Sequence, residues 1–488
     1  MKRKLSGILF FDLLLIIFAF FYYLIFFNRG IIDMDEGYML HLADRITQGQ
    51  MPFRDFVSIY TPGYLYIIAI VFKLFGSSIV ISRLVSLFFC LGIILVTFLL
   101  LLELKIKAKF IHLASFLCLI SFGYPLINIV TVSWPAVLFV LFLILLLIKN
   151  TGKTKKYLLV LIGLDLALIL FFKQNFGLYF ALVTLALIFW LDKGIQEKIK
   201  SVLIISVSFL LPSLFWVYFL LIKNPQGFSD FLSYSRTFAS TFVFTYPPLS
   251  FLLQPFGIFK LIPYYLPLIF VIVIVYFISK GKIDKKYYSF YLFPLLGFIA
   301  LIYPGSDLLH LYPFYGFILV SILVFSLKNK YFRFVLLVII LNILIGFYLT
   351  LFREYFRYLP PYRYQNTAIN VPRAKGLLVS KERALAIQGA YYIIAKNTAK
   401  NDRIFVYPAS PMLYFLFERQ NPSKDSFYVH PYSTYTDDRV IKEIRGSNIK
   451  YIVTDGEIKF PSELSKLVQK QHLIYQSDQI RVFKAEKF

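Results

Sequence analysis

The chain has 488 residues, of which 59% are hydrophobic and only 16% are charged, and its mean hydropathy is +0.72. Soluble domains are typically about 45–50% apolar and about 25% charged, so this composition excludes an ordinary soluble protein. The net charge is +25, but no Lys/Arg-rich run with interleaved aromatic residues indicates a nucleic-acid-binding groove. Cys90 and Cys118 both lie in apolar runs and lack the spacing of a disulfide framework or a metal site.

Apolar runs near 20 residues recur along most of the chain, and each is long enough to cross a hydrocarbon core about 30 Å thick. The first run follows the basic start Met1-Lys2-Arg3-Lys4, but it is too long for a signal peptide and lacks a small-residue cleavage site. We therefore expect a retained anchor and a multi-span α-helical membrane protein. The predicted spans are eleven, at residues 7–27, 79–102, 110–126, 131–148, 157–172, 176–191, 201–222, 262–279, 288–303, 309–327 and 332–352.

The positions of Lys and Arg predict the orientation of these spans. The N-terminus and every connection after an even-numbered span are basic, whereas the short connections near 127–130 and 304–308 contain no Lys or Arg. This is the positive-inside pattern of a plasma-membrane protein with its N-terminus in the cytoplasm. An even number of spans would break the alternation. Three longer segments are then expected outside the cell, at residues 28–78, 223–261 and 353–488.

The last of these segments alternates helix-like and strand-like patterns. We predict a transmembrane catalytic domain at 1–352 and a small extracytoplasmic α/β domain at 353–488. The expected helices of the second domain are 382–397 and 436–445, and its expected strands are 403–407, 450–454 and 480–484.

Three carboxylates, Asp33, Asp35 and Glu36, follow the first span within four positions. Asp35 is a suitable N-cap and Glu36 suits the positive first turn of a helix. Apolar residues then recur at helical spacing, which predicts an amphipathic helix that lies at the membrane interface and ends near Gly49. Thr61-Pro62-Gly63 opens a second apolar helix that is expected to end at Gly76.

The first external segment resembles a known family of enzymes. The residues that carry the resemblance are Asp35-Glu36-Gly37-Tyr38, Ala43, Ile46, Gly49, Pro52, Asp55-Phe56 and Pro62. They are similar to the first external loop of GT-C glycosyltransferases, and most of all to the bacterial branch grouped with protein O-mannosyltransferases, aminoarabinose transferases and lipopolysaccharide galacturonosyltransferases. The layout of many spans, two interfacial helices and a soluble C-terminal part agrees with this resemblance.

The resemblance implies a glycosyltransferase that takes a sugar from a polyprenyl-phosphate carrier at the outer face of the membrane. The acceptor would be a lipid, a glycan or a protein of the cell envelope. Asp35 would act either as the base for the acceptor or as the ligand of a divalent metal near the donor phosphate, and Glu36 would support it. Asp33-Met34-Asp35 is also a DxD, so Asp33 is either a further metal ligand or an ordinary loop acid. Such a reaction needs a base for the nucleophile and positive charge for the departing phosphate.

Several polar residues on the outer face are candidates for contact with the donor. Lys173 interrupts an apolar run, and the stretch FKQNFGL around it resembles a Lys-containing stretch of the family; the alternative is a lysine that snorkels to the interface. His310 lies in a stretch that resembles a late family motif, and a helix cap at Asp307 is its main rival. The remaining candidates are Gln174, Asn175, Tyr312, Arg54, Asp55 and Arg83, the last of which could instead anchor its span.

Some residues depart from the family pattern. Aminoarabinose-type relatives carry a Lys before a Pro-Pro in the first loop, where this chain has Tyr60-Thr61-Pro62-Gly63. Several relatives also have an acid in the second external loop, where this chain offers only Asn128. These departures argue against a metal held by acids of two loops and leave a metal held by Asp35, Glu36 and Asp33, or no metal. Asp165 lies in mid-span, where a charge is costly and indicates function unless it is neutral or hydrogen-bonded.

Two other classes of function remain as alternatives. A transporter or flippase of lipid-linked saccharides would show paired repeats and polar residues near the midplane. The sequence has no such repeat, and its polar residues gather at the outer edge. A non-catalytic scaffold of an envelope assembly would leave the candidate residues scattered.

Overall fold

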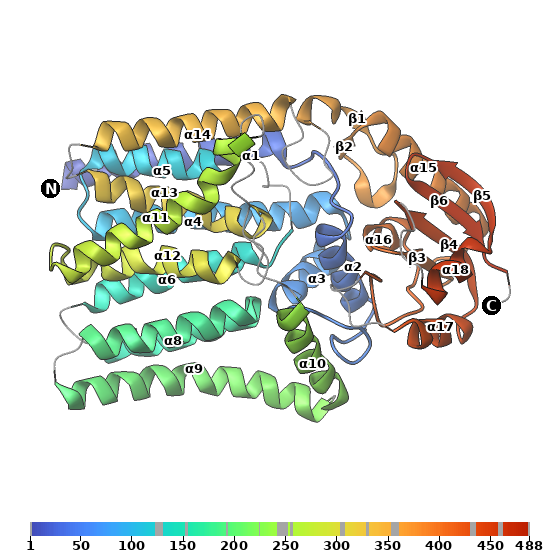
Figure 1. The fold of residues 1–488 in the computed structure, drawn as a ribbon, viewed down its shortest axis with the longest axis horizontal. Coiled ribbons are helices and arrows are strands. Elements are labelled where there is room, and N and C mark those ends of the chain that lie inside the picture. The colour runs from blue at the N-terminus through green and yellow to red at the C-terminus, as the bar shows by residue number, and fades with distance from the viewer. Residues whose placement is uncertain are drawn as a thin grey trace.

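The computed structural model of the chain describes residues 2–122, 130–151, 155–191, 194–223, 225–241, 252–253, 257–302, 308–327, 331–352, 361–429, 436–456 and 462–486. A bundle of long helices forms one half of the molecule and the C-terminal α/β part forms the other (Figure 1). The helices α2 and α3 lie between these two halves. The N-terminus lies at the end of the bundle that is farthest from the C-terminal part.

Each of the eleven predicted spans coincides with a helix. Their bounds are α1 Lys2–Phe26, α4 Ile79–Glu103, α5 Ala108–Phe122, α6 Ser133–Asn150, α7 Lys156–Phe172, α8 Gln174–Leu191, α9 Ile195–Lys223, α11 Gly257–Ser279, α12 Tyr288–Ile302, α13 Leu308–Ser326 and α14 Phe332–Phe352. Within the described residues, α4, α6, α14 and parts of α9 and α11 are long and apolar enough to cross a membrane. The number of spans therefore stays a prediction.

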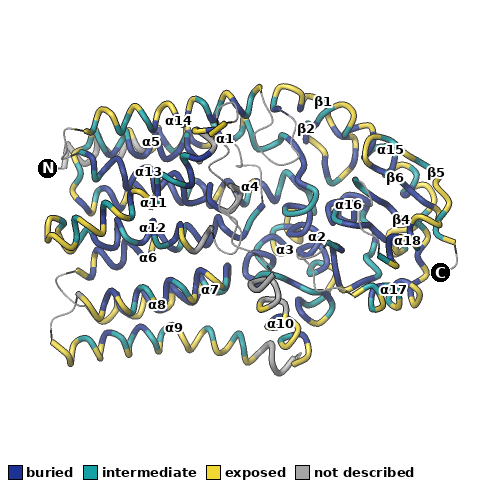
Figure 2. Tube along the Cα trace, viewed as in Figure 1, coloured by how far each residue is buried: buried dark blue, intermediate teal, exposed yellow. Residues whose placement is uncertain are grey.

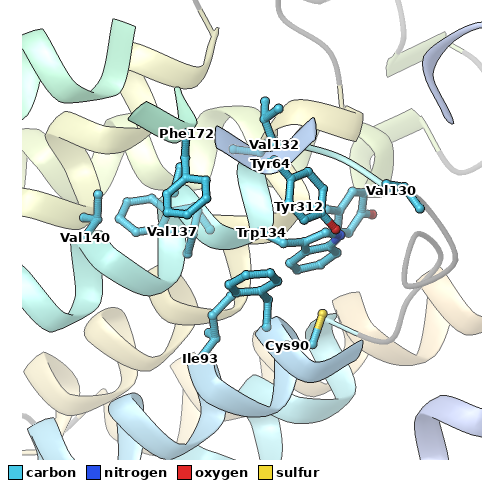
Figure 3. Packing of buried hydrophobic residues seen from close by; sticks show 14 of the residues in the cluster. Tyr64, Cys90, Ile93, Val130, Val132, Trp134, Val137, Val140, Phe172 and Tyr312 are labelled. Atoms are coloured by element: carbon cyan, nitrogen blue, oxygen red, sulfur yellow. The ribbon is translucent and has the colours of Figure 1, made fainter. Parts of the chain in front are cut away.

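The bundle has buried inner helices and an apolar outer surface. Large apolar side chains such as Phe21, Phe88 and Phe215 are 61%, 69% and 73% exposed, as expected for groups that contact lipid. Exposed residues lie along outer helices such as α9 and α14 (Figure 2). Inside, Trp134 of α6 is fully buried and lies among Tyr64, Cys90 and Tyr312 (Figure 3). Cys90 and Cys118 are free and buried, which agrees with their expected role as core residues.

The segment predicted to be the first external one, residues 28–78, forms the two predicted helices, α2 at Asp35–Thr47 and α3 at Gly63–Phe75. Two details of the prediction for α2 are wrong. Asp35 is the first residue of α2, and the cap position is taken by Met34, whose side chain makes no capping hydrogen bond. The helix also has no exposed polar face, because residues 36–45 are all buried. The short helix α16, Met412–Phe417, packs against α2 and covers the face that the sequence pattern assigns to water.

The second external segment contains a helix that the sequence pattern did not predict, α10 at Pro225–Thr241. It packs against the end of α9. Phe231 of α10 meets Phe53 of the first external segment edge to face, with 4.9 Å between ring centroids.

The C-terminal part is built around a four-stranded sheet with the strand order β3-β4-β6-β5. Strands β3 and β4 are parallel, and the other neighbours are antiparallel. The predicted elements are present as α15 Lys381–Asn397, β3 Arg403–Tyr407, α17 Asp437–Arg445, β4 Ile449–Asp455 and β6 Ile480–Lys484. In this part, the elements that were not predicted are β1 Thr367–Ala368, β2 Leu378–Val379, α16 Met412–Phe417, α18 Glu463–Gln469, β5 His472–Ser477 and the short 3-10 helices η3 Tyr362–Tyr364 and η4 Pro372–Ala374. A further 3-10 helix that was not predicted, η2 Lys285–Tyr287, directly precedes α12 in the bundle.

One apolar core extends from the bundle into the C-terminal part. Met39 and Leu42 of α2 belong to the same buried cluster as Leu413 and Phe415 of α16. A second, smaller cluster lies in the sheet around Phe405. The division into domains at residues 352 and 353 stays a prediction, since the core is continuous across it.

Candidate active site

Glu36 and Arg83 form a buried ion pair beneath the first external segment. Both side chains are fully buried, and the Arg83 Nε and Nη2 atoms lie 2.7 and 2.6 Å from the two carboxylate oxygens of Glu36. Arg83 also donates to the carbonyl oxygens of Phe27, Arg29 and Gly30 at 2.8–3.1 Å. The five N–H donors of the guanidinium are thereby used. These are the contacts of an anchor, one of the two roles expected for Arg83.

Asp33 is paired with the C-terminal part of the chain. Its Oδ1 atom lies 2.7 Å from Nη2 of Arg383. The same guanidinium binds both carboxylate oxygens of Asp455 at 2.8 and 2.6 Å, and Ser410 donates a hydrogen bond to Asp455 at 2.9 Å. Burial raises the pKa of Asp33 to about 6, although the charge of Arg383 opposes this shift. Of the two roles open for Asp33, these contacts favour a loop acid with a structural partner.

Asp35 lies between these two paired carboxylates, at the start of α2, and is half-buried. It is near Tyr60, whose pKa is raised by burial and further by the negative charge of Asp35. Gln174 fixes the backbone on both sides of Tyr60, because it donates to the carbonyl oxygen of Ile59 at 2.8 Å and accepts from the amide of Thr61 at 3.2 Å. The structure therefore brings the predicted residues Asp35 and Gln174 to the same loop.

Lys173 is the residue directly before Gln174, in the connection between α7 and α8. Its side chain is buried, with 4% exposed, so the ammonium group does not snorkel to the surface. The Nζ atom donates to Ser133 Oγ at 2.9 Å and lies 4.6 Å from the centre of the Phe176 ring. Burial lowers the pKa of Lys173 to about 7. A hydroxyl and a ring compensate a buried ammonium only weakly, so an anion would be a favourable additional partner.

Arg54 and Asp55 pair with each other at 2.7 Å, and Asp55 also accepts a hydrogen bond from the backbone amide of Met51. The Arg54 side chain is 51% exposed, and its hydrogen bonds lower the pKa of Asp55. These contacts stabilise a surface turn.

Asn175 is exposed and accepts a hydrogen bond from the amide of Phe176. Tyr312 is buried close to Trp134 (Figure 3). The His310 side chain and Asp307 lie outside the described residues. Asp165 is buried in α7, and its carboxylate oxygens have no hydrogen-bond partner in the described part of the chain.

The expected metal ligands do not form a common centre. Among the residues that the structure describes, no group of three or more His, Cys, Asp or Glu side chains could hold a metal ion. Glu36 and Asp33 point to different arginines, Arg83 and Arg383. The side chains present thus do not fit a metal held jointly by the three carboxylates.

Sequence reasoning missed several residues of the site. Ser133 is an ordinary helix residue in the sequence, and only its hydrogen bond with Lys173 singles it out. Tyr60 stands out in the sequence only as part of a stretch that departs from the family pattern, and its proximity to Asp35 was not expected. Arg383 lies far along the chain from Asp33 and carries no local motif. Its contact depends on how the C-terminal part docks.

Comparison with solved structures identifies the fold. The chain has the fold of the GT-C membrane glycosyltransferases, as the first-loop resemblance implies. In particular, it matches ArnT from Cupriavidus metallidurans bound to undecaprenyl phosphate, with a TM-score of 0.64 and 12% identity over 98% of both chains. The apo form of that protein matches with a TM-score of 0.62 and 13% identity, over 99% of this chain and 98% of that one.

A second protein with this fold is the oligosaccharyltransferase of Archaeoglobus fulgidus. The match to its complex with Zn and sulfate has a TM-score of 0.52 and 12% identity, over 90% of this chain and 67% of that one. No protein-family model and no curated protein matches the sequence. The common feature of the chain and these proteins is thus the fold.

Proposed function

We propose that the protein transfers a sugar from a polyprenyl-phosphate-linked donor to a lipid, glycan or protein acceptor at the outer face of the plasma membrane. The observation that carries this proposal is the match over 98% of both chains to ArnT bound to undecaprenyl phosphate. A lipid-linked donor keeps its tail in the bilayer, so its phosphate must react at the membrane surface. The proposed site lies beside the end of the bundle that bears α2 and α3 (Figure 1).

The proposed reaction is a single displacement at the anomeric carbon. The oxygen of an acceptor hydroxyl forms a bond to that carbon, and the bond from the carbon to the phosphate oxygen breaks. Asp35 takes the hydroxyl proton as general base, and the polyprenyl phosphate leaves with the bonding electron pair. Lys173, when protonated, stabilises the negative charge of the phosphate.

The proposed orientation puts the N-terminus in the cytoplasm and the C-terminal part outside. The basic connections along the sequence support it. The two ends of the bundle in Figure 1 also agree with it, because the N-terminus lies opposite to the C-terminal part. Neither of the two matched proteins is named as a transporter, so these matches do not favour the transporter alternative.

The test of the proposal is the variant Asp35→Asn, assayed with a lipid-linked sugar donor. Loss of a general base should lower turnover at least about 100-fold, while the yield of folded protein stays unchanged. Asp230→Asn is the matched control, because Asp230 is an exposed acid on α10. Normal turnover of the Asp35→Asn protein would show that Asp35 is not the general base.

A further inference from the structure

Two arginines hold the segment that carries the three carboxylates, and they come from opposite halves of the molecule. Arg83 belongs to α4 of the bundle and Arg383 to α15 of the C-terminal part. Arg83 binds Glu36, which follows Asp35, and Arg383 binds Asp33, which precedes it by two positions. The candidate base therefore lies between two tethered neighbours.

Arg383 is itself held firmly. It lies in the first turn of α15, whose cap Ser380 accepts a hydrogen bond from the Arg383 amide. Its guanidinium makes two parallel bonds to Asp455 at the end of β4, and such bidentate pairs are both strong and directional. The side chain is 16% exposed. Asp33 is thus tied to a group whose position the sheet determines.

The backbone around Asp33 is also held by the C-terminal part. The carbonyl oxygen of Asp33 accepts a hydrogen bond from the amide of Met412 at 3.3 Å, and Gly30 donates to Leu378 at 2.9 Å. The residues that lead into α2 are therefore bound to the C-terminal part through both a side chain and the backbone. These contacts fix the position of the backbone on both sides of Asp35, and a displacement of about 1 Å at a reacting group can cost roughly 100-fold in rate.

The geometry points to Arg383 as a positioning residue for Asp35: through its ion pair with Asp33 it sets the direction from which the carboxylate of Asp35 meets the acceptor. Arg383 acts through Asp33 and does not itself touch the donor or the acceptor. This inference rests on the proposed function of Asp35. It gives the C-terminal part a defined role in the reaction.

A second arginine provides a matched control. Arg373 also comes from the C-terminal part and also pairs with α2, at 2.9 Å from Asp44 and with 14% of its side chain exposed. Asp44 is nine positions beyond Asp35, which is about 13 Å along a helix that rises 1.5 Å per residue. If ion pairs across this interface matter only for docking, the loss of either arginine should have the same effect.

The test compares Arg383→Ala, Arg383→Lys and Arg373→Ala in the full chain. We expect Arg383→Ala to lower kcat by about tenfold or more, with the donor KM changed less than about twofold, because only the orientation of the base is lost. Arg383→Lys should recover part of kcat, and Arg373→Ala should keep it near the wild-type value. Equal losses of kcat in Arg383→Ala and Arg373→Ala would overturn the inference, as would an unchanged kcat in Arg383→Ala.

Two further measurements keep the inference testable. If Arg383→Ala does not fold, Asp33→Asn removes the same ion pair with little change of shape. A kcat of Asp33→Asn that is about tenfold lower than that of the wild type would then support the inference, and an unchanged kcat would overturn it. A second measurement does not depend on enzyme activity: the rate at which the Asp35→Cys protein reacts with a membrane-impermeant maleimide. The native cysteines are buried, so this reaction reports the introduced cysteine. Adding Arg383→Ala should accelerate this reaction and adding Arg373→Ala should not; equal rates would contradict the inference. If the wild-type protein transfers no sugar, the proposed function fails, whereas the maleimide rates still test the positioning.

Discussion

At the scale of the residue, the four positions Asp35-Glu36-Gly37-Tyr38 have separate tasks. Glu36 is bound by Arg83, and Gly37 leaves room for Met412. Tyr38 donates to the carbonyl of Val57 at 3.2 Å and accepts from the amide of Ile59 at 3.0 Å. Three residues of this run therefore hold the loop in shape, and our proposal assigns the proton transfer to Asp35.

Lys173 gives a prediction for pH dependence. Its pKa is lowered to about 7 by burial, so the free protein loses the ammonium charge as the pH rises through this value. The phosphate of a sugar phosphodiester keeps its charge over the same range. We expect kcat/KM for the donor to fall above about pH 7, because this parameter reports groups of the free enzyme.

The matched variant for this experiment is Lys173→Arg, since arginine stays charged at all relevant pH values. Its kcat/KM should be independent of pH between about 6 and 9, provided that the larger group is accommodated. A wild-type profile without any decline over this range would show that Lys173 is not the phosphate contact.

At the scale of the element, the connection between α1 and α2 depends on one residue of α4. Arg83 satisfies three carbonyl oxygens of this connection and the buried carboxylate of Glu36. A buried ion pair contributes little net stability when both partners are present, but the loss of one partner leaves an uncompensated charge. Arg83 is thus a point at which the bundle and the first external segment are joined.

We therefore expect Arg83→Leu to destabilise the folded protein by about 3–5 kcal/mol. The double variant Arg83→Leu/Glu36→Leu should be more stable than the single one, because no buried carboxylate remains without a partner. Thermal unfolding in detergent measures both. The role of Arg83 as an anchor would be contradicted if the single variant unfolded at the wild-type temperature.

The elements of the bundle could be predicted because apolar length is a local property of the sequence. All eleven apolar segments contain helices, and α3 ends before Gly76, which has a φ of +89°. The burial of α2 could not be predicted, because α16 that covers it lies more than 350 residues further along the chain. Asp35 and Lys173 could be selected because local sequence patterns surround them. Arg383 could not, because its pairing with Asp33 exists only once the C-terminal part has docked on the first external segment.

At the scale of the whole molecule, the C-terminal part rests on the first external segment through many contacts. His41 of α2 stacks on Tyr414 with 4.8 Å between ring centroids. Arg45 donates to the carbonyl of Ser423 at 3.1 Å. Together with the shared apolar core, these contacts hold the two halves of the molecule against each other.

Gly37 tests this close packing. A Cβ atom at this position would lie 2.4 Å from the amide nitrogen of Met412, so Gly37→Ala must push α16 away from α2. We expect a lower unfolding temperature and faster proteolysis of the C-terminal part. Gly446→Ala is the control, because its Cβ would lie 3.4 Å from the nearest atom. Equal protease resistance of both variants would show that α16 yields without undocking.

The backbone hydrogen bonds between Gly30 and Leu378, and from Leu378 to Asn28, have a consequence for biogenesis. They join the end of the first helix to a segment that the ribosome synthesises about 350 residues later. At roughly 5–20 residues per second, this interval lasts tens of seconds. It follows that the loop that carries Asp35 lacks these contacts until the last quarter of the chain has been synthesised, so that the native arrangement of this loop forms only when translation is nearly complete.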